Sequence, residues 1–176
     1  MKEIKLTKGQ VALVDDEDYE SVAKYKWQAS LSCTGRTWYA SRTVTMSGKR
    51  TMIRLHQVIL SAPSGFHVDH KNRNGLDCRR SNLRLATRCG NAANRSLRSD
   101  NTSGFKGVYR KHNPAFAGRK YCWAAQIRHN YKYSCIGYFK TAEEAARAYD
   151  VKAREFFGEF AWLNFPDIEA AKDGKS

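Results

Sequence analysis

Residues 67–95 contain the side chains in this sequence that are best suited to hydrolytic chemistry. Asp69 and His70 are adjacent, and Asn82 and Asn91 follow within the same stretch. Carboxylate and amide oxygens are hard ligands suited to Mg²⁺, which keeps several waters and usually needs only one or two protein groups. A neutral imidazole beside such an ion can take a proton from an attacking water. Asn and Asp in a glycine-containing loop also commonly do nothing more than form turns, which is the alternative interpretation.

The local pattern predicts the elements that would position these groups. Apolar and polar residues alternate up to the Asp-His pair, as in a strand, and residues 82–86 read as a second short strand. Thr87 is a suitable N-cap for a short helix ending near Arg95. A strand, loop, strand and helix in this order would fold the Asp-His pair back beside a helix that carries Asn91 and Asn94.

The segment VDHKNRNGLDCRRSNLR resembles the HNH endonuclease family, and within it the phage and intron-encoded homing endonucleases. The resemblance implies a ββα-metal fold for this region and a Mg²⁺ or Mn²⁺ ion as cofactor. It implies that His70 is the general base and that Asp69 and Asn91 are the metal ligands. Asn82 would orient His70 and brace the loop. The implied products are a 5′-phosphate and a 3′-hydroxyl.

Other polar residues near the motif are candidates for supporting roles. His56 lies in an apolar helix predicted at 55–60, where a single histidine is usually structural, and His67 directly precedes the motif. Either could contact metal or phosphate, and Asn94 is a third candidate. Basic residues crowd the same region, and we expect them to contact the phosphate backbone. They are Arg79, Arg80, Arg84, Arg88 and Arg95.

The charge balance points to an anionic partner. The chain has 31 Lys and Arg against 17 Asp and Glu, a net charge of +14, which favours a polyanion over a small acid. No stretch reaches the roughly 18 apolar residues of a membrane span, and no signal peptide is recognisable. The 5 cysteines form no CxxC pair, so neither a disulfide framework nor structural zinc is expected. We therefore expect a cytoplasmic protein, in a bacterium or a phage-infected host cell.

The first 50 residues read as a β-rich leader that packs on the nuclease core at 51–98. Strands are predicted around Ile4 and over 11–14, on either side of a turn at Lys8 and Gly9. An acidic cluster then opens a short helix whose apolar spacing extends to Trp27. A further hairpin is predicted with its turn at Ser47 and Gly48. Nothing in this leader looks catalytic.

The C-terminal part has a different pattern. Residues 99–104 are polar and turn-rich, as in a linker, and residues 101–140 contain no Asp or Glu. Three strands are predicted at 105–110, 123–128 and 133–139. The sequence from Thr141 to Glu144 is a capping box that opens an alanine-rich helix running to about Phe157, with Gly158 as its stop. Residues 167–176 read as a tail.

The segments GFKGVYR, WAAQIR, IGYFKTAEEAARAYDVKA and LNFP resemble the plant ethylene-response-factor (Apetala-type) DNA-binding domain, over 105–166. That family inserts a three-stranded sheet into the major groove of duplex DNA, which is wide enough to admit strands. Because Lys, Tyr, Gln and Cys replace several of the family's usual residues, the resemblance supports the docking mode and not the plant target sequence. The residues expected to contact DNA are Lys106, Tyr109, Arg110, Lys111, Gln126 and Arg128.

The sequence thus predicts an α+β protein: a ββα-metal HNH core with a β-rich N-terminal part, then a three-stranded antiparallel sheet packed on one helix. The predicted function is a monomeric, metal-dependent, homing-type endonuclease on double-stranded DNA, nicking one strand per active site. A non-catalytic DNA-binding regulator on an inactive HNH scaffold is the alternative. RNA binding is a third interpretation, disfavoured because the deep major groove of RNA would not admit a sheet.

Overall fold

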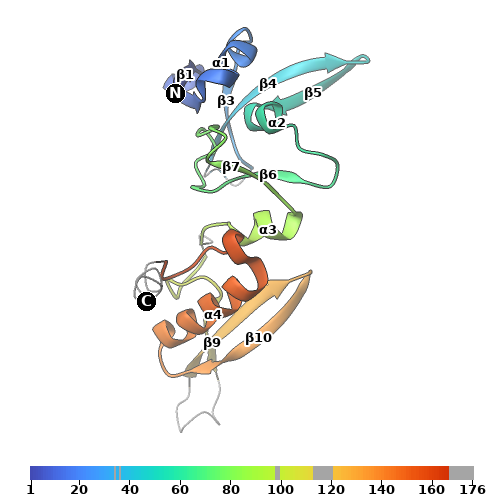
Figure 1. Ribbon diagram of the computed structural model, residues 1–176. Coiled ribbons are helices and arrows are strands. Elements are labelled where there is room, and N and C mark those ends of the chain that lie inside the picture. The colour runs from blue at the N-terminus through green and yellow to red at the C-terminus, as the bar shows by residue number, and fades with distance from the viewer. Residues whose placement is uncertain (34, 36, 98–99, 113–120, 167–176) are drawn as a thin grey trace, which may run out of the picture. The chain divides into compact units, whose positions relative to one another are not determined.

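The computed structural model describes residues 1–33, 35, 37–97, 100–112 and 121–166. It is a mixed α/β structure, and within these residues it contains four helices and several small sheets (Figure 1). The chain divides into two compact units, Met1–Asn91 and Ala92–Ser176. The insert between the first two predicted C-terminal strands, at 113–120, and the predicted tail at 167–176 lie outside the described residues. No described helix is both long and apolar enough to cross a membrane.

The first unit begins with an antiparallel hairpin of β1 (Lys2–Lys5) and β2 (Val11–Val14). A short 3-10 turn, η1 (Thr7–Gly9), connects them. Lys8 and Gly9 both have positive φ, 58° and 66°, so the chain reverses there as the sequence predicted.

Helix α1 (Asp16–Ala23) follows at once, with three acidic residues in its first turn, where the helix dipole favours negative charge. The sequence predicted helical spacing as far as Trp27, but the helix ends at Ala23. The buried Trp27 indole instead donates to the Val22 carbonyl at 2.9 Å and closes the turn below the helix.

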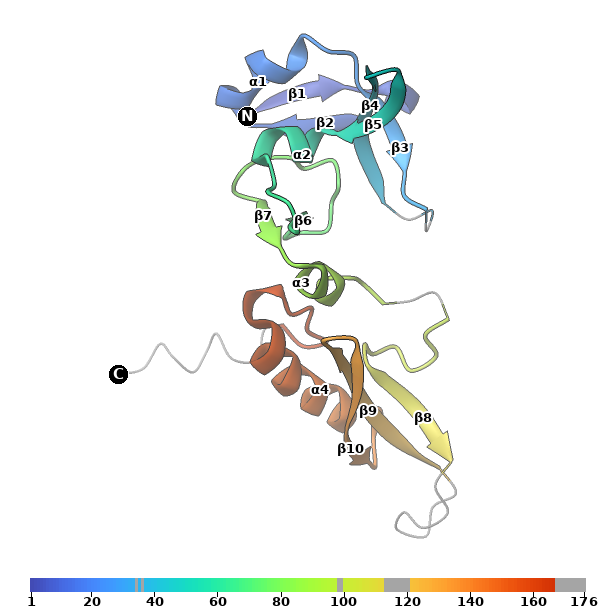
Figure 2. The same ribbon diagram turned by 90° about the vertical axis from the view of Figure 1, so that its right-hand side faces the viewer.

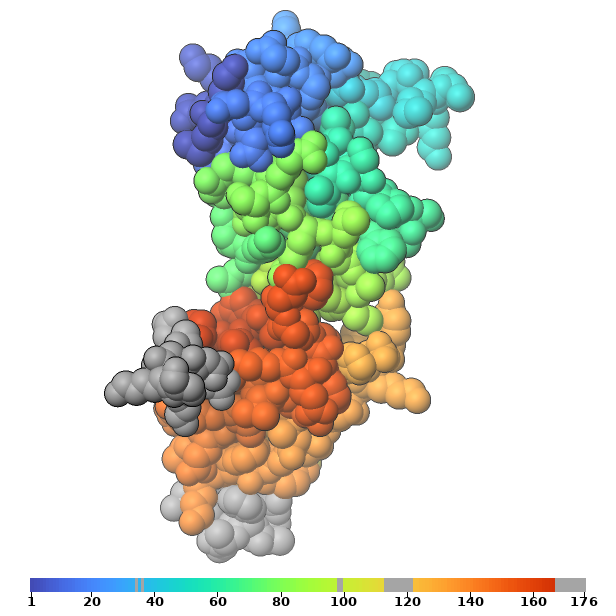
Figure 3. Space-filling model, in the orientation of Figure 1, coloured from blue at the N-terminus to red at the C-terminus, as the bar shows by residue number. Residues whose placement is uncertain are grey.

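A three-stranded antiparallel sheet follows, in the order β3-β4-β5. Its strands are β3 (Gln28–Leu31), β4 (Trp38–Met46) and β5 (Lys49–Arg54). The β4–β5 hairpin was predicted, and its tip stands out from the rest of the unit (Figure 3). Strand β3 was not predicted, since its four residues are too few to give a strong pattern and include no β-branched or aromatic side chain. Helix α2 (Leu55–Leu60), predicted from its apolar run, begins directly after β5.

The motif region forms an antiparallel pair, β6 (His67–His70) and β7 (Leu83–Ala86), followed by helix α3 (Arg88–Ala93). The register places His70 opposite Leu83 and Asp69 opposite Arg84. The hydroxyl oxygen of Thr87 accepts from the Gly90 amide at 3.1 Å, which confirms the predicted N-cap.

One hydrophobic core serves both the leader and the motif. It contains residues of β1, β2, α1, β4, α2, β6 and β7. Strand β2 also pairs with the motif loop, because the Leu13 amide donates to the Leu76 carbonyl and the Cys78 amide donates to the Leu13 carbonyl, both at 2.9 Å. The leader is therefore built into the same folded unit as the motif.

The second unit contains a three-stranded antiparallel sheet in the order β10-β9-β8, with a bulge in β10. Its strands are β8 (Val108–His112), β9 (Tyr121–His129) and β10 (Lys132–Phe139). Helix α4 (Ala142–Phe157) runs along one face of this sheet (Figure 2) and is followed by the 3-10 turn η2 (Gly158–Phe160). The predicted three strands and single helix are confirmed, and so is the capping box between Thr141 and Glu144.

Alanine lets α4 lie close to the sheet. Ala145, Ala146 and Ala153 are buried against the sheet side chains, and Tyr149 fills the space between them. Gly107 has a φ of +74°, and a Cβ at that position would overlap the Tyr149 ring. Glycine is therefore required there both by backbone conformation and by the close approach of the helix.

Candidate functional site

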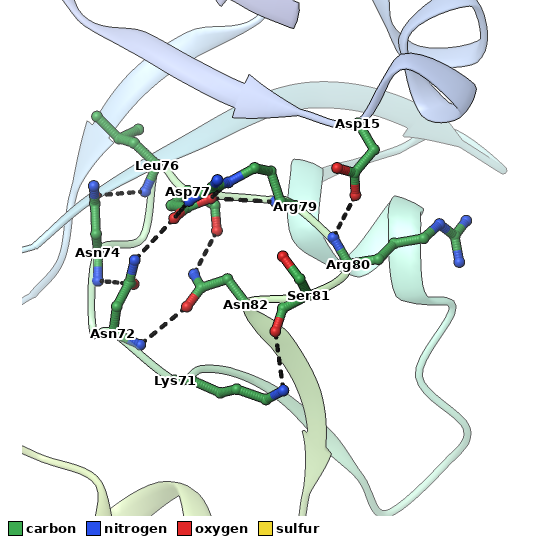
Figure 4. A network of polar contacts seen from close by, with 10 residues as sticks. All are labelled: Asp15, Lys71, Asn72, Asn74, Leu76, Asp77, Arg79, Arg80, Ser81 and Asn82. Atoms are coloured by element: carbon green, nitrogen blue, oxygen red, sulfur yellow. Dashed lines mark hydrogen bonds and ion pairs between the residues drawn. The ribbon is translucent and has the colours of Figure 1, made fainter. Parts of the chain in front are cut away.

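The loop between β6 and β7 is held by the central asparagine of the motif (Figure 4). Asn82 Oδ1 accepts from the Asn72 amide at 3.0 Å, and its Nδ2 donates to the Asp77 carbonyl at 2.8 Å. The Asn72 side chain donates in turn to Asp77 Oδ2 at 2.8 Å. Asn82 is buried, so these contacts brace the loop from within. The family resemblance implied that Asn82 would brace the loop; that it also orients His70 stays a prediction.

Two of the predicted phosphate-binding arginines are paired with carboxylates inside the first unit. Arg79 binds both oxygens of the buried Asp77 at 2.7 Å, and this hydrogen bonding lowers the pKa of the Asp77 carboxyl. Arg80 binds both oxygens of Asp18 at 2.8 Å, and its main-chain amide donates to Asp15 Oδ2 at 2.7 Å (Figure 4). These pairs tie the loop to itself and to the start of α1.

The predicted metal ligand Asp69 is buried in β6 and paired across the strands. Arg84 Nε and Nη2 both lie 2.9 Å from Asp69 Oδ2, and the Arg84 side chain is itself mostly buried. The structure therefore gives Arg84, predicted to contact phosphate, a carboxylate partner directly opposite in the sheet. Because this ion pair is shielded from solvent, removing either partner would leave a buried charge unpaired, which is costly.

His70, the predicted base, lies in an aromatic surrounding that the sequence did not indicate. Its ring is 4.7 Å from the His56 ring, nearly perpendicular to it, and 5.9 Å from the Tyr39 ring. Burial lowers the pKa of His70 to about 4, although the Asp69 and Asp77 charges act in the opposite direction. Burial and the nearby His70 lower the pKa of His56 to about 3. Both imidazoles are therefore neutral at neutral pH.

The remaining predicted site residues lie in different settings. Asn91 is half-buried on α3, and His67 is exposed at the start of β6. Asn94 is buried just after α3. Arg88, the first residue of α3, and Arg95, two residues after its end, are both exposed. The division between the two units falls within α3, after Asn91.

The donor set at Asp69 and Asn91 fits a hard divalent ion by its chemistry. A carboxylate and an amide oxygen are ligands that Mg²⁺ accepts, with waters completing the shell. Asp69 Oδ2 is paired with the Arg84 guanidinium. That Asp69 and Asn91 together hold a metal ion stays a prediction.

Comparison with known proteins identifies the family. A family model for HNH endonuclease matches residues 61–93, from the end of α2 to the end of α3. A mimivirus protein of Acanthamoeba polyphaga, described as an uncharacterized HNH endonuclease, is 32% identical over 167 residues, covering 92% of this chain and 78% of its own length. The chain belongs to the HNH endonuclease family. No solved structure gives a significant match.

Membership of this family makes the chain a nuclease and implies DNA as its substrate. HNH nucleases generally use divalent metal ions, which agrees with the donor chemistry at Asp69 and Asn91. The matched segment contains Asp69, His70, Asn82 and Asn91, and the match to the mimivirus protein extends over most of the chain.

The endonuclease also carries a basic sheet face in its second unit. The face of β8–β10 opposite α4 presents cations against tyrosines: Lys111 Nζ lies 2.8 Å from the Tyr138 hydroxyl, and the Arg128 guanidinium lies 5.3 Å from the Tyr133 ring centre. Such contacts hold a cation in place without neutralising it. Strand alternation places four of the predicted DNA-contacting residues on this face, namely Tyr109, Lys111, Gln126 and Arg128.

Two predicted contact residues lie elsewhere. Lys106 precedes β8, and its ammonium donates to the main-chain carbonyls of Ala93 and Arg95, the latter at 2.9 Å. Arg110 is exposed on edge strand β8, where alternation directs it to the opposite face from Lys111. DNA contacts by these two residues stay a prediction.

A rice protein, dehydration-responsive element-binding protein 2E, is similar to part of the chain. It is 49% identical over 51 residues, which is 28% of this chain and 16% of the rice protein. A match this short only weakly suggests an ethylene-response-factor-type domain in the second unit.

Sequence reasoning missed Tyr39, Arg54 and Cys78 near the site. Tyr39 contacts both His56 and His70, and the Arg54 guanidinium stacks 4.8 Å above the Tyr39 ring centre. Cys78 is fully buried in the motif loop. Nothing in the local pattern around these residues marks them, because their neighbours come from distant parts of the chain.

Proposed function

We propose that this HNH endonuclease is a metal-dependent, site-directed enzyme of the homing type that nicks one DNA strand per active site. The observation that carries the proposal is the position of His70 beside Asp69 at the end of β6, where the chain enters a loop braced by Asn82. A neutral imidazole is the form that can accept a proton from water. The products would be a 5′-phosphate and a 3′-hydroxyl.

Each group would have a separate task. Asp69 and Asn91 would hold the divalent ion, whose positive charge would stabilise the charge that develops on the phosphate. His70 would accept the proton of the attacking water at a ring nitrogen. Asn82 would keep the loop, and with it the position of His70, from shifting as DNA binds. The low pKa of His70 keeps it unprotonated at neutral pH.

The sheet of the second unit would supply DNA affinity and register. Its outer face carries Lys111 and Arg128 beside tyrosines, and residues 101–140 contain no acidic side chain to oppose a phosphate backbone. Docking of the strands in the major groove is supported by the resemblance to the plant domain. We propose that the protein binds double-stranded DNA as a monomer.

Nicking of supercoiled plasmid tests this proposal, ideally with DNA from the source genome. We expect nicking with Mg²⁺, none with EDTA, and a loss of at least about 10³-fold in His70→Ala with DNA affinity retained. Parallel loss of nicking and binding in a folded His70→Ala protein would show that His70 is structural. Competition binding with duplex DNA and duplex RNA would show which of the two nucleic acids the protein prefers.

A second candidate is a non-catalytic DNA-binding protein, and one observation favours it. Asp69 and His70 are both buried, and Asp69 is already paired with Arg84. Tight, salt-sensitive binding without nicking on DNA that contains the binding site would support this alternative.

A further inference from the structure

Three potential metal ligands converge in the interior of the first unit. His56 comes from α2, His70 from the end of β6, and Cys78 from the loop between β6 and β7. One ring nitrogen of each histidine and the Cys78 sulfur all lie within 4.8 Å of one another. The three residues are 3%, 6% and 0% exposed, so the group is enclosed by protein.

His56 supplies an independent indication that something binds here. Its Nδ1 is buried and has no hydrogen-bond partner among the residues that the structure describes. A buried polar atom without a partner costs about 1–3 kcal/mol, so such atoms are rare unless an ion or water satisfies them.

The chemistry of the three groups selects the ion. Imidazole nitrogen and thiolate sulfur favour Zn²⁺ and similar borderline ions, whereas Mg²⁺ prefers oxygen. Zinc bonds of about 2.0–2.3 Å keep tetrahedral ligand atoms about 3.3–3.8 Å apart. Small side-chain rotations would bring atoms that already lie within 4.8 Å to that spacing.

We propose that His56, His70 and Cys78 form a second metal site, which takes Zn²⁺ and is separate from the oxygen ligands Asp69 and Asn91. The Cys78 thiol would give up its proton to solvent when the sulfur binds the ion. The sequence did not indicate this site, because its ligands come from three elements and include no CxxC pair.

Zinc binding would have a consequence for the enzyme, which rests on the proposed role of His70. An imidazole that donates its nitrogen lone pair to Zn²⁺ cannot use that lone pair to accept a proton from water. Occupation of the second site would therefore inhibit cleavage, even with the hard-metal ligands loaded with Mg²⁺. Cys78 and His56, which have no role in the proposed cleavage step, would thus make the nuclease sensitive to zinc through the base that they share a site with, His70.

Binding is tested first, on the full chain and without DNA. Zn²⁺ affinity is measured by competition with a chromogenic chelator, and Co²⁺ is added to look for the thiolate-to-cobalt absorption band. We expect one Zn²⁺ per chain and a thiolate band with Co²⁺. We expect Cys78→Ala to remove the band and weaken Zn²⁺ binding by at least about 100-fold, and His56→Gln to weaken it similarly.

Matched controls keep this test decisive. A triple variant, Cys33→Ser, Cys89→Ser and Cys135→Ser, removes the three cysteines that are not buried and leaves Cys78 and Cys122. It should keep the thiolate band, even where the Cys78→Ala protein is too unstable to study. Absence of Zn²⁺ binding in the wild type, or loss of the band in the triple variant, would overturn the proposal.

Cleavage is then measured with Mg²⁺ in the presence and absence of Zn²⁺, each protein normalised to its own rate with Mg²⁺ alone. We expect Zn²⁺ to inhibit the wild type strongly and Cys78→Ala much less. Stoichiometric Zn²⁺ binding without inhibition would uphold the site and refute His70 as the base. Equal inhibition of both proteins would overturn the inhibitory role of the site.

Discussion

The two units of this endonuclease use their cationic side chains in opposite ways. In the first unit, Arg79, Arg80 and Arg84 each bind a buried carboxylate within the protein. On the outer sheet face of the second unit, Lys111 and Arg128 lie against tyrosines, which do not cancel their charge. The partner of an arginine, more than its place in a basic run, thus indicates whether it stabilises the fold or is available to bind a polyanion.

The first unit also buries two histidines, and we expect acid to reduce its stability more than any other change considered below. His56 and His70 have folded-state pKa values of about 3 and about 4, below the ordinary value of 6.5. Their neutral forms therefore contribute stability that is complete above about pH 6.5 and is lost as the pH falls toward these values. At pH 4.5 we expect a loss of about 2–3 kcal/mol per histidine.

Urea unfolding followed by tryptophan fluorescence would measure this loss in a Trp123→Phe, Trp162→Phe background, which leaves only Trp27 and Trp38 of the first unit. His56→Phe should remove about half of the pH dependence, and His67→Phe, at an exposed position, should leave it unchanged. An equal pH dependence in wild type and His56→Phe would contradict the prediction.

Arg80→Ala should produce the next largest effect, and it should be an effect on stability. The change leaves the Asp18 carboxylate, whose side chain is 9% exposed, without its guanidinium partner. Because Arg80 itself is 46% exposed, we discount the cost of a fully buried pair to about 2 kcal/mol. Arg88→Ala, on the exposed start of α3, is the control and should change the free energy of unfolding by less than about 0.5 kcal/mol.

Arg128→Ala should show the opposite behaviour, with DNA affinity falling and stability unchanged. We expect roughly 10-fold weaker binding and a salt dependence reduced by about one phosphate contact. Arg147→Ala, on the exposed side of α4 away from the sheet face, is the matched control. Equal DNA affinities for these two variants would show that the outer sheet face is not part of the binding surface.

The smallest effect is expected at the rings beside Arg128. Tyr133→Ala removes the ring that holds the guanidinium in place, and binding should weaken about 2–4-fold. Tyr133→Phe keeps the ring and should bind like the wild type. A loss in Tyr133→Phe equal to that in Tyr133→Ala would show that the hydroxyl, not the ring, makes the contribution.

Local sequence patterns were sufficient for most of the elements. The Thr141 capping box, the Thr87 N-cap and the strands on either side of the motif loop all follow from residues close together in the chain. Strand β3 escaped prediction because Gln28–Leu31 is short and has no β-branched or aromatic residue; it forms by pairing with β4. Elements with a strong local signal were thus predictable, and elements defined by their partners were not.

The same distinction applies to the site. The resemblance to HNH endonucleases indicated His70, Asp69, Asn82 and Asn91 as candidates, and the family match covers the segment that contains them. The sequence could not show that Arg80 would pair with Asp18, because those residues are 62 positions apart. It also could not show that Cys78 would lie beside two histidines. Contacts between distant segments decide charge and burial, and these determine what each side chain can do.

The pairing of β2 with residues 76–78 has a practical consequence for transplanting this nuclease. Leu13 exchanges main-chain hydrogen bonds with Leu76 and Cys78 on either side of Asp77. A cassette cut to residues 61–93, the span that the family model matches, would leave those loop groups without their partners. Chimeras that move the cutting activity onto another DNA-binding module should therefore carry the chain from β1 onward, since the leader is part of what shapes the loop.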